Sequence, residues 1–342
     1  MAYLVTGATG FIGRFLIPEL LKRDGDIHVL VRPGGDSADR YTCCAREWMG
    51  GERVRPVRGD MGAPGLGIDP AWIAEHRGSI EHVFHLASSY DVTERGGGTR
   101  HVVDVAEQLK ATLLHHVSTV DVAGGFDGGL FTEDMFDEGP VPSSPMQRAK
   151  FEAEKIVRES ELDWRIYRPS IVIGHSRTGE IDRIEGPYYF FRLLRMAAQL
   201  PRILPVLVPK LGETNMVPVD FVARALAHIA HRPDSNHTTY HLADPRRQSA
   251  AEALNLFADE AGAPHLVEVM PKRTLEMMLR VPGTSWLLPR VGVPQDVLEH
   301  SEFSCWFDCR NATAALAGTD IKVPPLAAYA PVIWKYWIEN WV

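Results

Sequence analysis

Three glycines near the N-terminus, in the stretch GATGFIG, have a spacing that could bind a nucleotide cofactor. They follow the apolar run AYLVT and open a stretch with helical periodicity, which is the context that a dinucleotide-binding turn requires. Glycines allow a tight turn and a close backbone approach, while the unpaired N–H groups of a helix N-terminus attract a pyrophosphate. A purely structural turn is the alternative. The predicted cofactor-binding residues of this turn are Gly7, Thr9, Gly10, Phe11, Ile12 and Gly13.

The residue at the end of the second predicted strand selects between the two nicotinamide cofactors. An acidic residue there would bond the ribose 2′-hydroxyl, but the stretch VLVRP places Arg32 at this point. Because a guanidinium suits a 2′-phosphate, we predict NADP rather than NAD. The alternative is an ordinary exposed arginine at a strand end. Asp60 and Met61, after the third predicted strand, are predicted to flank the adenine.

The stretch SSPMQRAKFEAEK (143–155) has the pattern of a catalytic helix, with Lys150 on an amphipathic run. One turn earlier, where a hydroxyl-bearing acid would be expected, stands Met146. A thioether has no proton to give. The helix therefore belongs either to an enzyme that works without its usual acid or to a binding protein.

Strands and helices alternate in the first half of the chain and must position these groups. Short apolar runs separated by helical stretches predict an α/β fold, a Rossmann doubly wound parallel sheet covered on both faces. We assign residues 1–174 and 215–245 to this NADP-binding domain. Residues 175–214 and 246–342 are predicted to form a smaller, mostly helical C-terminal substrate lobe over the carboxyl ends of the strands. The predicted strands span 2–7, 26–33, 53–60, 80–88, 113–124 and 164–174, with a helix at 11–25.

Composition limits the partners. The 342 residues carry a net charge of −8 without a long basic run, which argues against nucleic acid. No apolar stretch is long enough to span a bilayer, and the N-terminus lacks the pattern of a signal peptide, so we expect a cytoplasmic monomer or homodimer. Cys305 and Cys309 have only His300 nearby, a poor zinc pattern, and we predict no metal site.

Several motifs together resemble an extended short-chain dehydrogenase/reductase. They are the glycine turn, GDM (59–61), HLAS (85–88) and VSTVDVAG (117–124). The stretches 166–191, 215–222 and 318–337 are similar, more narrowly, to the N-terminal reductase module of bacterial alcohol-forming fatty acyl-CoA reductases. The resemblance covers essentially the whole chain. It implies NADPH-dependent reduction of long-chain acyl thioesters or fatty aldehydes, and hence a small apolar carbonyl substrate.

The resemblance also assigns roles to residues. Thr119 falls on the catalytic Ser/Thr that holds the carbonyl oxygen, and Lys150 on the lysine that binds the nicotinamide ribose. The further cofactor-contacting positions are Leu86, Ala87, Ser88, Ser118 and Pro169.

The sequence departs from that family pattern at two places. The family's catalytic acid is a tyrosine four residues before the lysine, where this chain has Met146. Loss of a general acid typically costs roughly 10²–10⁴ in rate. The stretch TERGGGTR (93–100) is shorter than the family's segment and lacks the asparagine that supports a water-mediated proton relay.

Three interpretations follow. The protein is a reductase whose proton comes from Lys150, Thr119, ordered water or a substitute such as Tyr90, Tyr188, Tyr189 or His175. Alternatively, it catalyses a different, non-reductive reaction on a related substrate. In the third interpretation it binds NADP or a partner without catalysis.

Overall fold

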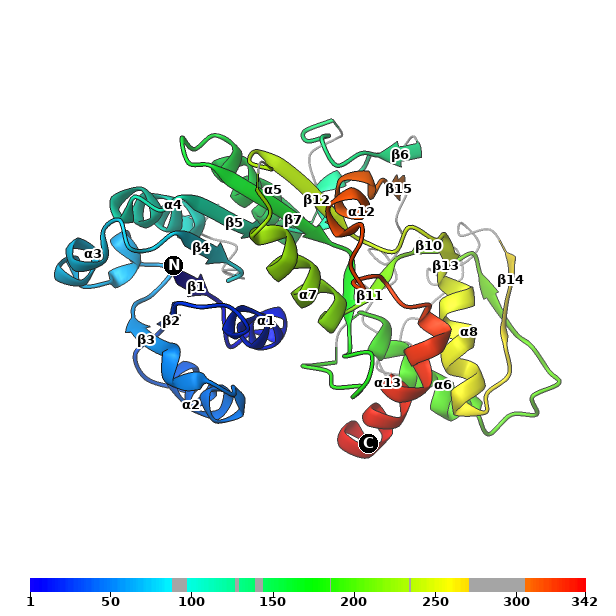
Figure 1. The fold of residues 1–342 in the computed structure, drawn as a ribbon. Helices are drawn as coiled ribbons and strands as arrows, with labels where there is room; N and C mark the ends of the chain where they lie inside the picture. The colour runs from blue at the N-terminus through cyan, green and yellow to red at the C-terminus, as the bar shows by residue number, and fades with distance from the viewer. Residues whose placement is uncertain (88–96, 127–128, 139–143, 185, 234, 271–304) are drawn as a thin grey trace.

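The computed structural model describes residues 1–87, 97–126, 129–138, 144–184, 186–233, 235–270 and 305–342 (Figure 1). Its centre is a seven-stranded sheet of order β12-β7-β5-β4-β1-β2-β3 in which every neighbouring pair is parallel. The strand order reverses beside β1, as in doubly wound sheets. The predicted Rossmann sheet is therefore confirmed. Its strands are β1 Ala2–Thr6, β2 Asp26–Val31, β3 Val54–Arg58, β4 His82–His85, β5 Leu113–Val117, β7 Trp164–Pro169 and β12 Thr238–Leu242.

Helices cover both faces of this sheet because its strands are apolar on both sides. One face packs against α1 (Phe11–Leu21), α2 (Asp36–Glu47), α7 (Val219–Ala230) and α12 (Arg310–Leu316). The other packs against α3 (Pro70–His76), α4 (Gly97–Leu109) and α5 (Pro145–Arg158). Short 3-10 turns lie at Gly51–Arg53, Pro64–Gly67, Val120–Ala123 and Gly186–Tyr188.

A further apolar core lies beyond the carboxyl ends of the strands, at the right of Figure 1. It is built by α6 (Tyr189–Ala197), α8 (Ala250–Ala261) and α13 (Leu326–Trp341), with Phe191 packed against the rings of Phe257, Trp334 and Trp337. Three small strand pairs lie in this region: β8 (Ile171–Ile173) with β11 (Met216–Pro218), β9 (Val206–Pro209) with β14 (Leu266–Met270), and β10 (Glu213–Thr214) with β13 (Gln248–Ser249). A fourth pair, β6 (Gly129–Phe131) with β15 (Cys305–Phe307), packs with Ala123 in a separate small cluster. The helix α12, which follows β15, packs instead in the core of the large sheet.

The start of α5 is set by local sequence. Ser144 is the N-cap and its hydroxyl accepts a hydrogen bond from the Gln147 N–H at 3.1 Å, while Pro145 occupies the first helical position. Residues four apart share one face of a helix, so Met146, Lys150, Glu154 and Arg158 form a single row along α5. The row begins exposed at Met146, is fully buried at Glu154 and ends at Arg158, whose side chain is 18% exposed.

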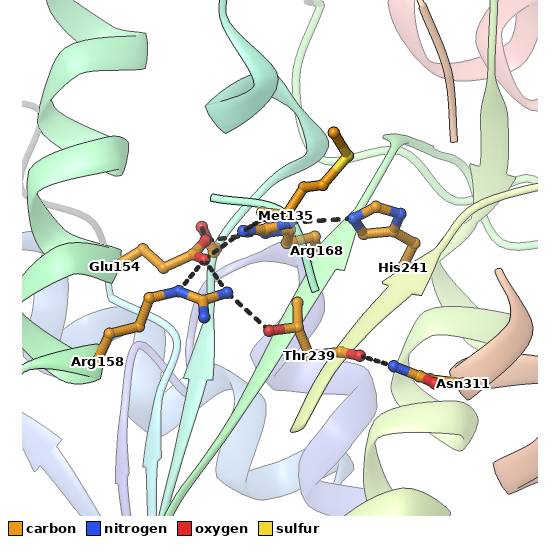
Figure 2. A network of polar contacts seen from close by, with 8 residues as sticks. Met135, Glu154, Arg158, Arg168, Thr239, His241 and Asn311 are labelled. Carbon is orange, nitrogen blue, oxygen red and sulfur yellow. Dashed lines mark hydrogen bonds and ion pairs between the residues drawn. The ribbon is translucent and has the colours of Figure 1, made fainter. Parts of the chain in front are cut away.

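Buried charges fasten α5 to the sheet (Figure 2). Both carboxylate oxygens of Glu154 accept hydrogen bonds from Arg168 on β7, at 2.6 and 3.1 Å, and neither side chain is exposed. Arg158 also donates to Glu154 at 2.9 Å and reaches Thr239 on β12. Arg168 further contacts His241 at 3.2 Å and donates to the Met135 carbonyl at 3.0 Å. The network fixes the rotation of α5 about its axis, and with it the direction of Lys150.

Candidate active site

The glycine turn lies between β1 and α1, at the point where the strand order of the sheet reverses. Gly7 has φ +75°, and a Cβ there would lie 2.6 Å from the Ala87 nitrogen. A Cβ on Gly13 would lie 2.2 Å from the Gly7 carbonyl oxygen. Gly10 is the N-cap of α1 and provides no side-chain cap, so the first N–H groups of the helix face outward for an anion. These residues fit the pyrophosphate of a dinucleotide, and within this turn Ile12 packs against the sheet core while the Phe11 ring contacts Phe15.

Arg32 stands just after β2 and is held by Asp60. The guanidinium contacts the Asp60 carboxylate at 3.1 and 3.2 Å, and the Arg32 side chain is 63% exposed. Asp60 also accepts from the Gly62 N–H at 3.0 Å, and the Met61 carbonyl contacts the His101 ring nitrogen Nδ1 at 3.1 Å. The structure therefore brings together the three residues that the sequence predicts around the adenosine end of the cofactor. Their roles in binding stay a prediction.

The ends of β4, β5 and β7 carry the other predicted cofactor contacts. Leu86 and Ala87 follow β4 and lie against the glycine turn, with the Ala87 N–H donating to the Thr6 hydroxyl at 3.4 Å. Pro169 ends β7. Ser118 is buried beneath the edge, and its hydroxyl donates to Glu154 at 2.6 Å. Ser88 lies outside the described residues, as do Tyr90 and the first half of TERGGGTR.

Thr119 and Lys150 belong to adjoining elements at this edge. The Thr119 hydroxyl caps the turn Val120–Ala123 by accepting from the Asp121 N–H at 3.2 Å, and it lies 3.1 Å from the Asp121 carboxylate. The negative charge of Asp121 acts on Lys150 as well. Burial lowers the pKa of Lys150 to about 8, and Asp121 opposes that fall. A lysine with this pKa holds a proton near neutral pH and can release it.

Met146 is 58% exposed at the start of α5. Two of the candidate substitute acids are already engaged elsewhere. The Tyr188 hydroxyl accepts from the Gly174 N–H at 2.7 Å, and burial raises its pKa well above the usual value. His175 accepts from the backbone N–H groups of Arg177 and Thr178 at 3.2 and 3.3 Å, in a turn beside Phe15. Tyr189 is the first residue of α6 and does not belong to the buried core that this helix helps to form.

Sequence reasoning assigned no role to two buried histidines below this edge. His85 ends β4, and its ring nitrogens lie 3.0 Å from the hydroxyls of Thr6 and Thr99. His116, on β5, lies 5.0 Å from His85 between ring centroids and is 2% exposed. The charge of Lys150 contributes to lowering the pKa of both imidazoles. The two histidines are neighbours because β4 and β5 are adjacent in the sheet, and no local sequence motif indicates this contact.

The Gly7–Gly13 turn, the partly buried Lys150 and the Thr119 hydroxyl therefore all lie toward the carboxyl ends of the strands. The family described as Male sterility protein matches residues 5–226 of the chain. The chain belongs to this family. It is thereby an extended short-chain dehydrogenase/reductase, an NAD(P)-dependent oxidoreductase.

Known relatives are larger than this chain. It is 29% identical over 278 residues to glycine betaine reductase ATRR of Emericella nidulans, covering 71% of this chain and 21% of the relative. It is 26% identical over 279 residues to aldehyde reductase lnbA of Aspergillus flavus, covering 72% of this chain and 27% of the relative. A crystal structure of the terminal R domain from the myxalamid PKS-NRPS biosynthetic pathway superimposes with a TM-score of 0.80 at 26% identity, covering 99% of this chain and 90% of that domain. The chain thus spans about a quarter of these curated relatives and nearly all of a terminal R domain.

Two other properties concern the described residues alone. Within them, no helix has the length and apolar character needed to cross a membrane. The same part of the chain contains no group of three histidine, cysteine or carboxylate side chains placed to hold a metal ion.

Proposed function

We propose that this family member is an NADPH-dependent reductase of an apolar carbonyl substrate, a long-chain aldehyde or an acyl thioester, with non-standard proton delivery. The observation that carries the proposal is that Asp121, which contacts the Thr119 hydroxyl, also acts electrostatically on Lys150, in a chain with a Gly7–Gly13 turn that fits a dinucleotide. The likeness to glycine betaine reductase and to an aldehyde reductase supports the reduction of a carbonyl group. In this reading the cofactor supplies hydride when bound.

NADP is the proposed cofactor because Arg32 is exposed and oriented. Asp60 holds the guanidinium at the end of β2, where a ribose 2′-phosphate would lie. A planar guanidinium can bind phosphate with two parallel hydrogen bonds while it keeps a second partner.

Thr119 is proposed to hold the carbonyl oxygen and Lys150 to bind the nicotinamide ribose. A hydroxyl that donates to a carbonyl oxygen stabilises the charge that develops there during reduction. The ammonium of Lys150 adds positive charge and, with its pKa near 8, a transferable proton.

The test is stopped-flow oxidation of bound NADPH with aldehydes and acyl-CoAs of increasing chain length. Wild type is expected to transfer hydride and Lys150→Ala to lose that activity. Met146→Tyr restores a phenol one turn before Lys150 and is expected to raise the rate by about 10-fold or more, as a positioned general acid does. Met196→Tyr is the matched control, because Met196 is also 58% exposed on a helix but lies on α6.

The second candidate is an NADP-binding protein of the same fold that is catalytically impaired or catalyses a non-reductive reaction. Met146 in the position of the acid favours it. Absence of hydride transfer in wild type together with clear turnover in Met146→Tyr would establish impairment and refute the reductase proposal.

A further inference from the structure

A cavity of about 210 Å³ lies where the strand pair β10–β13, the segment that follows β12 and the strand β15 meet. Four charged residues line it: Glu213 begins β10, Asp244 and Arg246 follow β12, and Arg247 directly precedes β13. The backbone of this wall is fixed, because the Asn215 side chain exchanges two hydrogen bonds of 2.8 Å with the backbone of Asp244. The cavity therefore presents charged groups from a well-held frame.

Two of these four charges neutralise each other. The Arg246 guanidinium donates two hydrogen bonds of 2.8 Å to the Asp244 carboxylate, and it also donates to the Val323 carbonyl at 3.1 Å. This bidentate ion pair uses most of the hydrogen-bonding capacity of Arg246. The pair therefore has a structural role, and Arg247 and Glu213 remain as the charges that a ligand can use.

Arg247 is oriented but has no counter-charge. Its guanidinium carbon lies 3.9 Å from the centroid of the Trp306 ring, so the group sits over the face of the indole. A guanidinium held by its face keeps its in-plane N–H groups available to donate. Among the described residues, Arg247 forms no hydrogen bond and no ion pair. Such a group suits the two oxygens of a carboxylate or a phosphate.

Glu213 is the second unpaired charge of the cavity. Loss of hydration and the nearby Glu252 raise the pKa of its carboxyl, and Arg247 opposes them. Arg247 is thus near enough to act on Glu213, yet these two described side chains form no ion pair with each other. A cation bound at Glu213 would stabilise the ionised carboxylate against its unfavourable surroundings.

We propose that this cavity binds a small zwitterion, with the acid group of the ligand at Arg247 and its ammonium at Glu213. Opposite charges that face one cavity without pairing are complementary to a ligand that carries both charges. The acid group is a carboxylate or a phosphate, since each offers two oxygens to a guanidinium. Binding of this kind goes beyond the proposed reductase function and needs neither Thr119 nor Lys150.

Isothermal titration calorimetry of the protein without cofactor tests this binding. Phosphoethanolamine and β-alanine join an ammonium to a phosphate or a carboxylate, and the one that binds more tightly identifies the acid group. Ethyl phosphate and propionate lack the ammonium, and ethanolamine lacks the acid group. Each of these three is expected to bind at least about 10-fold more weakly than the better zwitterion, because it loses a charge-assisted hydrogen bond. Low ionic strength preserves the electrostatic contribution of these partly exposed groups.

Arg247→Gln and Glu213→Gln remove the two charges separately. Arg247→Gln is expected to weaken binding of the zwitterion about 10-fold or more. Glu213→Gln is expected to lower the affinity for the zwitterion to that of the matching probe without an ammonium. The control is Arg310→Gln, which alters a 77% exposed arginine that follows β15 and is paired with Asp308. It is expected to leave the affinity unchanged.

Two results would overturn the zwitterion site. One is a wild-type protein that binds neither zwitterion, or binds them no more tightly than the probes with a single charge. The other is an affinity that Arg247→Gln leaves unchanged. Because the titration uses neither cofactor nor carbonyl substrate, it decides this site even if the wild-type protein transfers no hydride and the reductase proposal fails.

Discussion

Lys150 is poised by two opposing effects on a single ammonium group. Burial disfavours the charged form, and the Asp121 carboxylate favours it, which leaves a pKa of about 8. Asp121 also engages the Thr119 hydroxyl, so one carboxylate tunes both proposed catalytic groups. Asp121 therefore governs the fraction of Lys150 that is protonated near neutral pH.

Asp121→Asn should therefore move the pH dependence of reduction. Removing the carboxylate removes the effect that raises the Lys150 pKa, so that pKa falls below about 8. Activity that needs the ammonium is full below this pKa and is lost above it. The alkaline limb of kcat/KM, measured between pH 6 and 9.5, is expected to shift to lower pH. A limb that stays in place would show that another group controls it.

Arg32→Ala should weaken NADPH binding selectively. A charge-assisted, bidentate contact to phosphate contributes roughly 1.5–3 kcal/mol, or about 10- to 100-fold in affinity. NADH lacks the 2′-phosphate, so its affinity is expected to change little. Fluorescence titration of both cofactors measures the difference, with Arg40→Ala on α2 as control. Equal losses for NADPH and NADH would contradict the assignment.

The helix α5 holds Lys150 in position. Its row of residues runs from Met146 at the open edge, through Lys150, to the buried carboxylate of Glu154. Glu154 also accepts a hydrogen bond from the hydroxyl of Ser118, the residue before Thr119, so the same carboxylate holds both the helix and the segment that follows β5. Both proposed catalytic residues thus depend on one buried ion network.

Glu154→Gln should be strongly destabilising. The substitution leaves the buried Arg168 and the adjacent Arg158 without their counter-charge, and breaking a buried ion pair costs about 3–5 kcal/mol. Glu152→Gln, two residues earlier on the helix, should change the free energy of unfolding by less than about 0.5 kcal/mol. Urea unfolding followed by circular dichroism compares the two variants. Similar values for both would mean that the network contributes little.

Most elements of the sheet could be predicted because apolar runs and helical periodicity are local signals. The predicted strands extend past the observed ones, and for two of them the structure gives the physical reason. The run 113–124 ends at Val117, since Thr119 caps a 3-10 turn. The run 164–174 divides after Pro169, and its second part pairs with β11 instead of β12. Arg32, Lys150 and the glycine turn were found by motif, whereas His85, His116 and Glu154 depend on which strands and helices become neighbours.

The whole molecule buries an unusual set of neutral histidines. Burial lowers the pKa of His28 and His82 to about 4, that of His116 and His241 to about 3, and those of His85 and His115 well below the usual value. Glu133 has the opposite effect on the pH dependence of stability. Burial raises its pKa to about 7, although its carboxylate accepts hydrogen bonds from three backbone N–H groups. The histidines outnumber this one carboxyl, so they decide the sign of the pH dependence.

Stability should therefore fall in mild acid. Below about pH 6.5 the unfolded chain protonates its histidines while the folded chain keeps them neutral, down to about pH 4 for His28 and His82. The free energy of unfolding falls by roughly 1.4 kcal/mol per pH unit for each net proton that the unfolded state takes up. Glu133 offsets part of this loss between about pH 7 and its ordinary pKa, since there the folded state binds its proton. Urea midpoints at pH 7.5, 6 and 5 are expected to decline steadily. A midpoint that is constant over this range would mean that the buried histidines are protonated in the folded protein as they are in the unfolded chain.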